Sequence, residues 1–151
     1  MKRVEVKLNL EAVAPLLDVI KAVADDLGVN LAVSPHLPEE EDLALVWKDE
    51  LLAGQTSDLV VFLSLFGSEF FASGVVPLDL NNSEPILRAC SAVRLRLREK
   101  YLKPLGDEAL ESGEVSLAEM PDLQQKAFAA YVFLATLQEL IVQHLDPTVM
   151  E

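Results

Sequence analysis

Six basic side chains between positions 88 and 103 are the residues whose type and spacing most directly suggest chemistry. They make up half of the twelve lysines and arginines of the chain, and they are Arg88, Arg94, Arg96, Arg98, Lys100 and Lys103. Such a cluster could dock an acidic protein or contact the phosphates of a nucleic acid. The first five are the candidate residues of a partner-docking helix: Arg88, Arg94, Arg96, Arg98 and Lys100.

The angular positions of these residues bear on the two alternatives. At about 100° per residue of α-helix, one apolar stripe runs along the same stretch, formed by Ile86, Cys90, Val93, Leu97 and Tyr101. Arg94 and Arg98 flank this stripe on one side, and Arg96 and Lys100 flank it on the other. A DNA-recognition helix gathers its basic residues on one exposed face. We therefore favour side chains that pair with surplus carboxylates over direct contact with DNA.

Cys90 is the single cysteine of the chain, and it lies on the apolar stripe. Unpaired cysteines mostly pack as small buried hydrophobic residues, which is the interpretation we favour. Redox sensing and nucleophilic catalysis are the alternatives, because Arg94 one turn away could lower the thiol pKa. One cysteine excludes an intrachain disulfide and any metal or iron–sulfur site built from several cysteines.

Known catalytic and metal-binding motifs are missing from the sequence. It has no glycine-rich phosphate loop, no His-Glu-x-x-His, no Gly-x-Ser-x-Gly and no EF-hand spacing. His36 precedes three glutamates, but this spacing does not bring several ligands together on one metal ion. We therefore predict no enzyme activity, no bound metal and no cofactor.

Composition narrows the possibilities further. The 151 residues include 12 lysines and arginines against 25 acids, which gives a net charge of −13. A hydrophobic content of 51% and a mean hydropathy of +0.28 exclude intrinsic disorder. The length predicts one domain over residues 1–151. Residues 1–10 lack the apolar core of a signal peptide, and the apolar runs 59–66 and 127–137 are shorter than the ~20 residues of a membrane span. We expect a cytoplasmic protein without membrane contact.

The first half of the chain predicts one strand and three helices. Residues 3–8 alternate between apolar and polar types, as a half-buried strand does. Residues 10–27 have helical spacing after the capping residue Asn9, although Pro15 predicts that the regular helix starts only near Ala14. After a connection over 29–38, a second helix covers 39–53 and ends at Gly54. A third begins at one of the capping residues 56–58 and reaches Ser73.

The second half predicts an edge strand and two helices. Pro77 confines residues 75–80 to a sheet edge, where they can pair with residues 3–8. A fourth helix runs from positions 84–85 to about 101–103, and residues 107–120 are acidic and loop-like, with one helical turn as the alternative. Asp122 and Gln125 form a capping-box pattern for a last helix that Pro147 ends. The predicted fold is mainly α, a compact bundle of about five helices with one or two short β-strands.

Four segments in this order resemble a family of small bacterial proteins. They are WKDELLAG (47–54), VPLDL (76–80), AVRLRLR (92–98) and AYVFLATLQEL (130–140). The family is the domain of unknown function with number two thousand and seventeen in its series. The resemblance implies a regulatory role, since some members are described as transcriptional regulators and their genes often neighbour that of the ClpS protease adaptor. It implies no catalytic residues.

We therefore expect a regulatory or adaptor domain that acts through protein–protein contacts. A transcriptional regulator that contacts DNA through the arginine-rich fourth helix is the alternative. The apolar residues of segments 59–71 and 127–145 exceed what one small core obviously needs, which favours a homodimer. Its interface would bury about 1,600 Å² in total. An apolar interface would also make dimerisation insensitive to salt.

Overall fold

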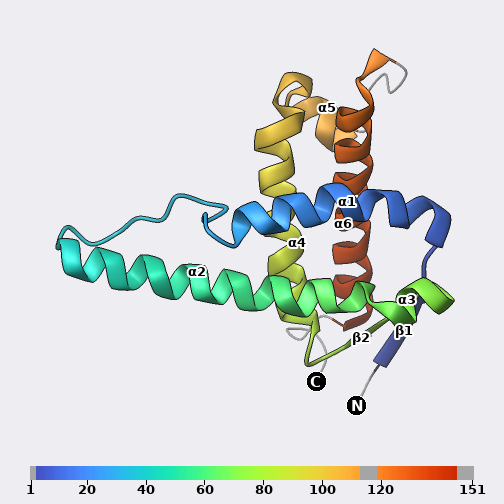
Figure 1. The fold of residues 1–151 in the computed structure, drawn as a ribbon, viewed down its shortest axis with the longest axis horizontal. Helices are drawn as coiled ribbons and strands as arrows, with labels where there is room; N and C mark the ends of the chain where they lie inside the picture. Colours follow the sequence, from blue (N-terminus) through green and yellow to red (C-terminus); the bar gives the residue numbers. More distant parts are fainter. Residues whose placement is uncertain (1–2, 113–118, 146–151) are drawn as a thin grey trace.

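The computed structural model describes residues 3–112 and 119–145 (Figure 1). Its main elements are β1 (Arg3–Lys7), α1 (Leu10–Leu27), α2 (Glu41–Leu63), α3 (Ser68–Ser73), β2 (Val75–Asp79), α4 (Ser83–Leu97), α5 (Asp107–Ser112) and α6 (Asp122–Leu145). Single turns of 3-10 and π-helix extend α2 and α4, namely η1 (Ser64–Phe66), η2 (Arg98–Leu102) and η3 (Lys103–Leu105). The predicted mainly α bundle with two short strands is confirmed.

The two strands pair with each other, as expected for residues 3–8 and 75–80. β1 and β2 are antiparallel, with Arg3 opposite Asp79 and Lys7 opposite Val75. Gly74 ends α3 in the left-handed conformation, at a φ of 75°. Its carbonyl accepts a hydrogen bond from the Leu8 amide at 2.7 Å. This hydrogen bond ties the residue after β1 to the residue before β2.

Helix α1 begins four residues earlier than Pro15 suggests. The Asn9 side chain accepts a hydrogen bond from the Ala12 amide and caps a helix that starts at Leu10. Pro15 therefore lies in the second turn, where its ring removes one backbone hydrogen bond. The apolar face of the helix, with Leu17, Ile20 and Val23 buried in the core, outweighs that loss.

The predicted helix end at Gly54 is wrong, because α2 continues through this residue. The helix is continuous from Glu41 to Leu63, and Gly54 lies inside it. A glycine in a helix interior costs only about 1 kcal/mol relative to alanine, so it does not end a helix by itself. The capping candidates after it stay in the helix, where Asp58 bonds to Arg88 of α4 instead. The predicted third helix is consequently divided among the end of α2, η1 and α3.

The core lies where α1, the end of α2, α4 and α6 meet. Four residues of the predicted stripe on α4 are fully buried: Ile86, Cys90, Val93 and Leu97. They pack with apolar residues of the neighbouring elements, among them Ile20, Leu27, Phe62, Phe70, Leu134 and Ile141. Gln125 donates from its side chain to the Met120 carbonyl at the start of α6. Pro147, the predicted end of that helix, lies outside the described residues.

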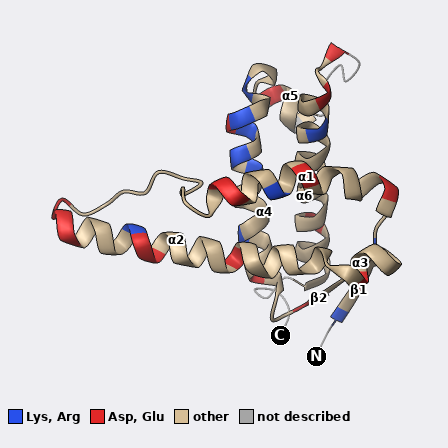
Figure 2. Cartoon of the chain, in the orientation of Figure 1, with Lys and Arg blue, Asp and Glu red and all other residues tan. Residues whose placement is uncertain are grey.

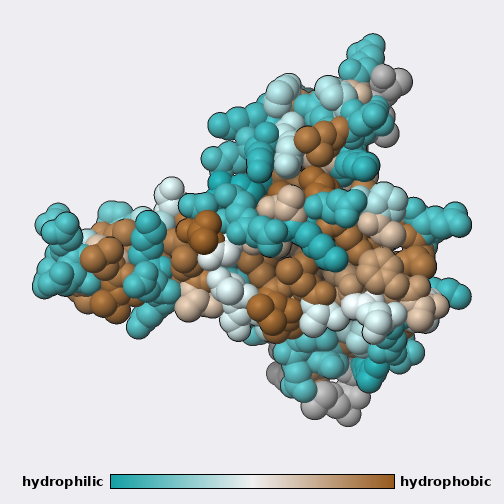
Figure 3. All heavy atoms as spheres, viewed as in Figure 1, coloured by the Kyte–Doolittle hydropathy of each residue, from teal (hydrophilic) through white to brown (hydrophobic). Residues whose placement is uncertain are grey.

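The N-terminal part of α2 extends away from this core (Figure 1). We call residues 41–53 the arm. Every side chain of the arm is exposed except Ala44 and Leu52, which are half-buried. Its exposed large apolar residues are Leu43, Leu45, Val46, Trp47 and Leu51. In the space-filling view, hydrophobic surface accordingly continues along the arm between charged groups (Figure 3).

Candidate protein-docking site

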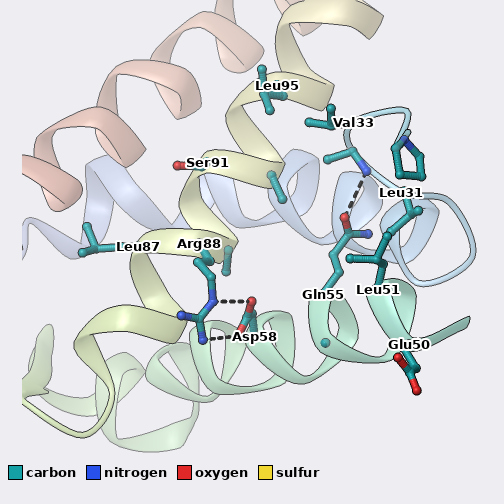
Figure 4. A pocket seen from close by; sticks show the side chains of 15 residues that line it. Leu31, Val33, Glu50, Leu51, Gln55, Asp58, Leu87, Arg88, Ser91 and Leu95 are labelled. Atoms are coloured by element: carbon teal, nitrogen blue, oxygen red, sulfur yellow. Dashed lines mark hydrogen bonds and ion pairs between the residues drawn. The ribbon is translucent and has the colours of Figure 1, made fainter. Parts of the chain in front are cut away.

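A cavity of about 670 Å³ lies where the arm joins the body (Figure 4). Three elements enclose it: the loop after α1, the second half of the arm with the turn that follows, and the outer face of α4. Most of its lining is apolar, including Leu31, Val33, Pro35, Leu51, Leu87 and Leu95. A concave, mainly apolar site with a few polar groups is the usual form of a binding site.

An ion pair fixes the crossing of α2 and α4 at one end of the cavity. The Arg88 guanidinium donates from Nε and Nη2 to the two Asp58 carboxylate oxygens, at 2.9 Å and 3.0 Å. The hydrogen bond to Asp58 raises the pKa of Arg88 above its ordinary value. The Asp58 side chain is 15% exposed, whereas that of Arg88 is 57% exposed. Because the two charges satisfy each other, this pair positions the two helices, and Glu50 is the other charged residue that lines the cavity.

Gln55 holds the loop that forms the opposite wall. Its side-chain Oε1 accepts a hydrogen bond from the Ala32 amide at 3.0 Å (Figure 4). Its Nε2 donates to the carbonyls of Leu27 at 2.7 Å and of Asn30 at 2.9 Å. One side chain of α2 thus binds three backbone groups at the end of α1 and in the following loop, and keeps Leu31 and Val33 at the cavity.

The apolar surface of the arm continues into the cavity. At about 100° per residue, Leu43, Trp47, Leu51 and Gly54 fall within one 80° sector of α2, the sector that also holds Asp58. Leu51, Gly54 and Asp58 line the cavity. Trp47, the single tryptophan of the chain, is 47% exposed. We call the side chains of Leu43, Trp47 and Leu51 the arm stripe.

A second, more polar hollow of about 290 Å³ adjoins the first along α4. It shares Ser91 and Leu95 with the cavity and adds Arg94, Arg98 and Tyr131. Arg94 donates from Nη1 to Gln138 at 2.7 Å, and its guanidinium lies 4.6 Å from the centre of the Tyr131 ring. The outer face of α4 therefore changes from apolar near Leu87 to basic near Arg98. We call this face, with both hollows, the α4 groove.

The remaining candidate basic residues lie on different sides of α4. Arg96 turns toward α1, where its Nε lies 3.0 Å from Asp26 Oδ2 outside hydrogen-bond alignment and its Nη2 donates to the Leu31 carbonyl. The Lys100 ammonium lies 5.6 Å from the centre of the Tyr101 ring. Arg94 and Arg96 thus bind opposite neighbours, α6 and α1, as their angular positions suggest. The structure brings Arg88, Arg94 and Arg98 to the α4 groove and directs Arg96 away from it.

Cys90 lies behind the groove, fully buried in the core. Burial raises the pKa of its thiol to about 12, and the nearby Arg94 lowers it only in part. The thiol is therefore protonated at neutral pH, which disfavours both a nucleophile and a redox sensor. No group of three or more His, Cys, Asp or Glu that could hold a metal ion occurs among the described residues.

The arm stripe is the part of this site that the sequence reasoning missed. Reading Gly54 as a helix end made residues 39–53 a separate helix of the bundle, whose apolar side chains would pack inside. One signal was available: apolar residues of this segment fall on every side of a helix, so a single core-facing stripe could not bury them all.

In comparisons with known proteins, no family model, no curated protein and no solved structure matches the chain. The resemblance based on four sequence segments therefore stays a prediction.

Proposed function

We propose that this chain is a non-enzymatic regulatory or adaptor domain that works by binding protein. Its docking surface is the arm stripe together with the α4 groove. The observation that carries the proposal is the continuous apolar surface from Leu43 through Leu51 into the cavity, which stays exposed although the loop after α1 lies beside the second half of the arm. Large exposed apolar patches on folded domains typically mark interaction sites.

The form of the surface indicates the kind of protein partner. A groove of this length between two helices and a loop suits an amphipathic helix, which lays its apolar side chains into the depression. Basic groups at Arg94 and Arg98 favour acidic residues at one end of that helix. Trp47 has the properties of a binding hot spot, because a large aromatic side chain loses little conformational entropy when it is buried.

Binding to DNA through α4 is the second candidate, and the basic residues near the C-terminal end of that helix favour it (Figure 2). Arg88 and Arg96 are engaged with Asp58 and Asp26, however, and the chain carries a charge of −13. Few cations thus remain to neutralise phosphates. A mobility-shift titration across salt concentrations tests this candidate, since micromolar, salt-sensitive binding of DNA would favour it over a protein partner.

Affinity capture with matched baits tests the proposal. The wild-type chain, Trp47→Asp and Val60→Asp are used to capture proteins from the source cells at low salt. Val60 lies on the same helix and is 63% exposed, but it faces away from the arm stripe. We expect wild type and Val60→Asp to retain the same proteins and Trp47→Asp to lose them. Equal retention by all three baits would contradict the assignment of the docking surface.

A further inference from the structure

We propose that the α4 groove binds a small carboxylic acid with an apolar tail. The carboxylate lies at Arg94 in the second, more polar hollow, and the tail crosses α4 into the cavity. This inference goes beyond the proposed function, because it gives the groove a small-molecule ligand, which a partner helix has to displace before it docks. Two observations support it: an arginine that no described acid neutralises, and an apolar cavity beside that arginine.

Arg94 is a half-buried cation without a carboxylate partner in the described part of the chain. Arg88 and Arg96 on the same helix both pair with acids of neighbouring helices. Arg94 instead donates from Nη1 to Gln138, and its Nε makes no hydrogen bond to a described residue. Most N–H donors of its guanidinium thus have no acceptor among these residues. Since the chain contains 25 acids against 12 lysines and arginines, an arginine left without an acid at a hollow favours an anion supplied by a ligand.

The Arg94 guanidinium is held in place before a ligand arrives. Its Nη1 donates to Gln138 Oε1 at 2.7 Å. Gln138 is itself anchored, because its Nε2 donates to the Leu87 carbonyl at 2.9 Å and to Ser91 Oγ at 2.8 Å. The guanidinium also lies 4.6 Å from the centre of the Tyr131 ring. A charged group that is already positioned loses little conformational entropy when a ligand binds, which raises the affinity of the site.

The polar hollow offers further groups to a carboxylate. Ser91 lies one turn before Arg94 and lines the same hollow. Its Oγ accepts from Gln138, and no described residue accepts its hydroxyl hydrogen, which is therefore available to a ligand. Arg98, one turn after Arg94, adds positive charge. Arginine and hydroxyl donors form charge-assisted hydrogen bonds with carboxylate oxygens. A phosphate carries more negative charge, so a chain of net charge −13 repels it more strongly than a carboxylate.

The apolar tail has a preformed place beside this hollow. Ser91 and Leu95 line both the polar hollow and the cavity, so the two adjoin over α4 (Figure 4). Ser91 is small and lies between the larger Leu87 and Leu95, four residues away on either side, so an elongated tail passes over α4 at this point. The cavity of about 670 Å³ is mainly apolar and falls within the ~300–1,000 Å³ of small-molecule sites. A carboxylic acid without an apolar tail would leave this lining in contact with water.

A bilayer is the other amphiphilic structure that could cover the groove and the arm. By length and composition alone, residues Glu41–Ser73 and α6 could each cross a membrane. Helices that lie on membranes usually carry lysine and arginine on their polar face, because biological surfaces are anionic. The arm instead carries Lys48 against four acids, Glu41, Asp42, Asp49 and Glu50. The concave cavity next to one positioned arginine therefore favours a single amphiphilic molecule over a bilayer surface.

Calorimetric titration with decanoate tests the inference, because decanoate combines a carboxylate with a linear apolar tail. It is used below the concentration at which it forms micelles. Decyltrimethylammonium is the matched control ligand, with the same tail and a positive head. We expect decanoate to bind the wild-type chain at least about tenfold more tightly than this cation. A net charge of −13 attracts the cation over most of the surface, so a preference for the anion has to come from a local site.

Variants assign the preference to Arg94. Arg94→Gln should weaken decanoate binding at least about tenfold, since the charge and its hydrogen bonds to the carboxylate are lost. Arg3→Gln is the matched control, because it removes one positive charge from β1 and lines neither hollow; its effect should stay below about twofold. Ser91→Ala removes one donor without changing the charge and should weaken binding about threefold or more. It keeps the test decisive if circular dichroism shows that Arg94→Gln does not fold.

Amide chemical shifts of the isotope-labelled wild-type chain locate the ligand. On addition of decanoate, we expect the largest changes at Ser91 and Leu95, which line both hollows, and further changes at Ala32 on the opposite wall of the cavity. Largest changes in β1 and β2 would place the ligand elsewhere and overturn the inference.

Three results of the titrations would also overturn it: no binding of decanoate in the millimolar range, a preference for decyltrimethylammonium, or equal affinity of wild type, Arg94→Gln and Ser91→Ala. If decanoate does not bind but capture of proteins still depends on Trp47, the proposed function stands without this ligand. If decanoate binds at Arg94 but Trp47→Asp captures proteins as wild type does, the ligand site stands and the assigned docking surface fails. If the chain sediments with phosphatidylcholine vesicles and binds decanoate independently of Arg94, its apolar surface contacts a bilayer and the inference fails.

Discussion

Arg88 of α4 donates hydrogen bonds to both carboxylate oxygens of Asp58 of α2. This ion pair lies at the point of α2 beyond which the arm extends away from the core. The arm is mostly exposed, and the described segment beside it is the loop after α1, which lines hollows together with Lys48, Glu50 and Leu51. The direction of the arm therefore depends on the contacts at its base, chiefly this ion pair and the hydrogen bonds of Gln55.

Loss of the Asp58 carboxylate should destabilise the crossing. We expect Asp58→Ala to lower the free energy of unfolding by about 1–2 kcal/mol, since two charge-assisted hydrogen bonds disappear and the exposed Arg88 regains water. Glu84→Gln is the control, because Glu84 lies 3.8 Å from Arg88 with both side chains exposed. Its effect should stay below about 0.5 kcal/mol in urea denaturation. Equal effects of the two substitutions would contradict a positioning role for Asp58.

Gln55→Ala should release the loop after α1, which forms one wall of the cavity. Three backbone groups lose their partner, and the half-buried ones among them cannot all regain water, so we expect a loss of about 1–3 kcal/mol. Faster hydrogen exchange at the Ala32 amide would localise the effect. Gln143→Ala is the matched control, because Gln143 makes one exposed hydrogen bond to Glu139. Unchanged exchange at Ala32 in Gln55→Ala would show that the loop is held by other contacts.

The two glycines Gly54 and Gly74 should respond oppositely to alanine. Gly74 has a φ of 75°, and an added Cβ would lie 2.9 Å from the Leu8 carbonyl oxygen, so Gly74→Ala should cost at least about 1–3 kcal/mol. Gly54 lies in a helix with open space around it, so Gly54→Ala should stabilise the monomeric fold by about 1 kcal/mol. Thermal unfolding at low concentration checks both signs. Destabilisation by Gly54→Ala there would mean that α2 is not a regular helix at this position.

Cys90 should react only when the fold opens. Since burial raises the pKa of its thiol from 9.0 to about 12, we expect a thiol reagent at pH 8 to label the native protein slowly and the urea-unfolded protein fast. Rapid labelling of Cys90 without denaturant would contradict its burial and would support a catalytic or redox role for the thiol.

The same pKa makes stability depend on pH in one direction. Below pH 9 the thiol is protonated in both the folded and the unfolded chain, so its full contribution to the free energy of unfolding is present. Between about pH 9 and 12 the unfolded chain ionises and the folded chain does not, and stability falls as pH rises. Comparison with Cys90→Ala over this range isolates the effect from other titrating groups. A difference that does not change with pH would show that the folded thiol ionises normally.

Local pattern was sufficient to predict much of the fold. Alternation in residues 3–8 predicted β1, and helical spacing predicted the buried stripe of α4 that includes Cys90. The angular positions of Arg94 and Arg96 predicted that they lie on different sides of α4. Each of these features depends on neighbours within a few residues, which is why the sequence contains it.

Tertiary interactions decided what local pattern could not. Gly54 and the capping residues after it indicate a helix end, yet Asp58 bonds to Arg88 thirty residues away and the helix continues. Whether the apolar residues of the arm face a core depends on that continuation, so Trp47 and Leu51 were not recognised as surface residues. The cavity joins three segments that are distant in sequence, and Gln55, which organises it, belongs to no motif.

The homodimer expected from the sequence has a separate test. At tens of micromolar, the wild-type chain should be a dimer at low and at high salt, because screening acts on charges and not on an apolar interface. Sedimentation equilibrium over a range of concentrations measures this. A 16.6 kDa monomer at both salt concentrations would contradict the homodimer and leave the docking surface to other proteins.

Affinity capture from the source cells at low and high salt tests the central claim most directly, with wild type, Trp47→Asp and Val60→Asp as baits. We expect wild type and Val60→Asp to retain the same proteins at both salt concentrations, because the arm stripe binds them through apolar contact. Trp47→Asp should raise the dissociation constant of these complexes at least about 30-fold, as the loss of a hot spot does, and should therefore retain little of them. Equal retention by all three baits, or proteins that bind wild type only at low salt, would contradict the account.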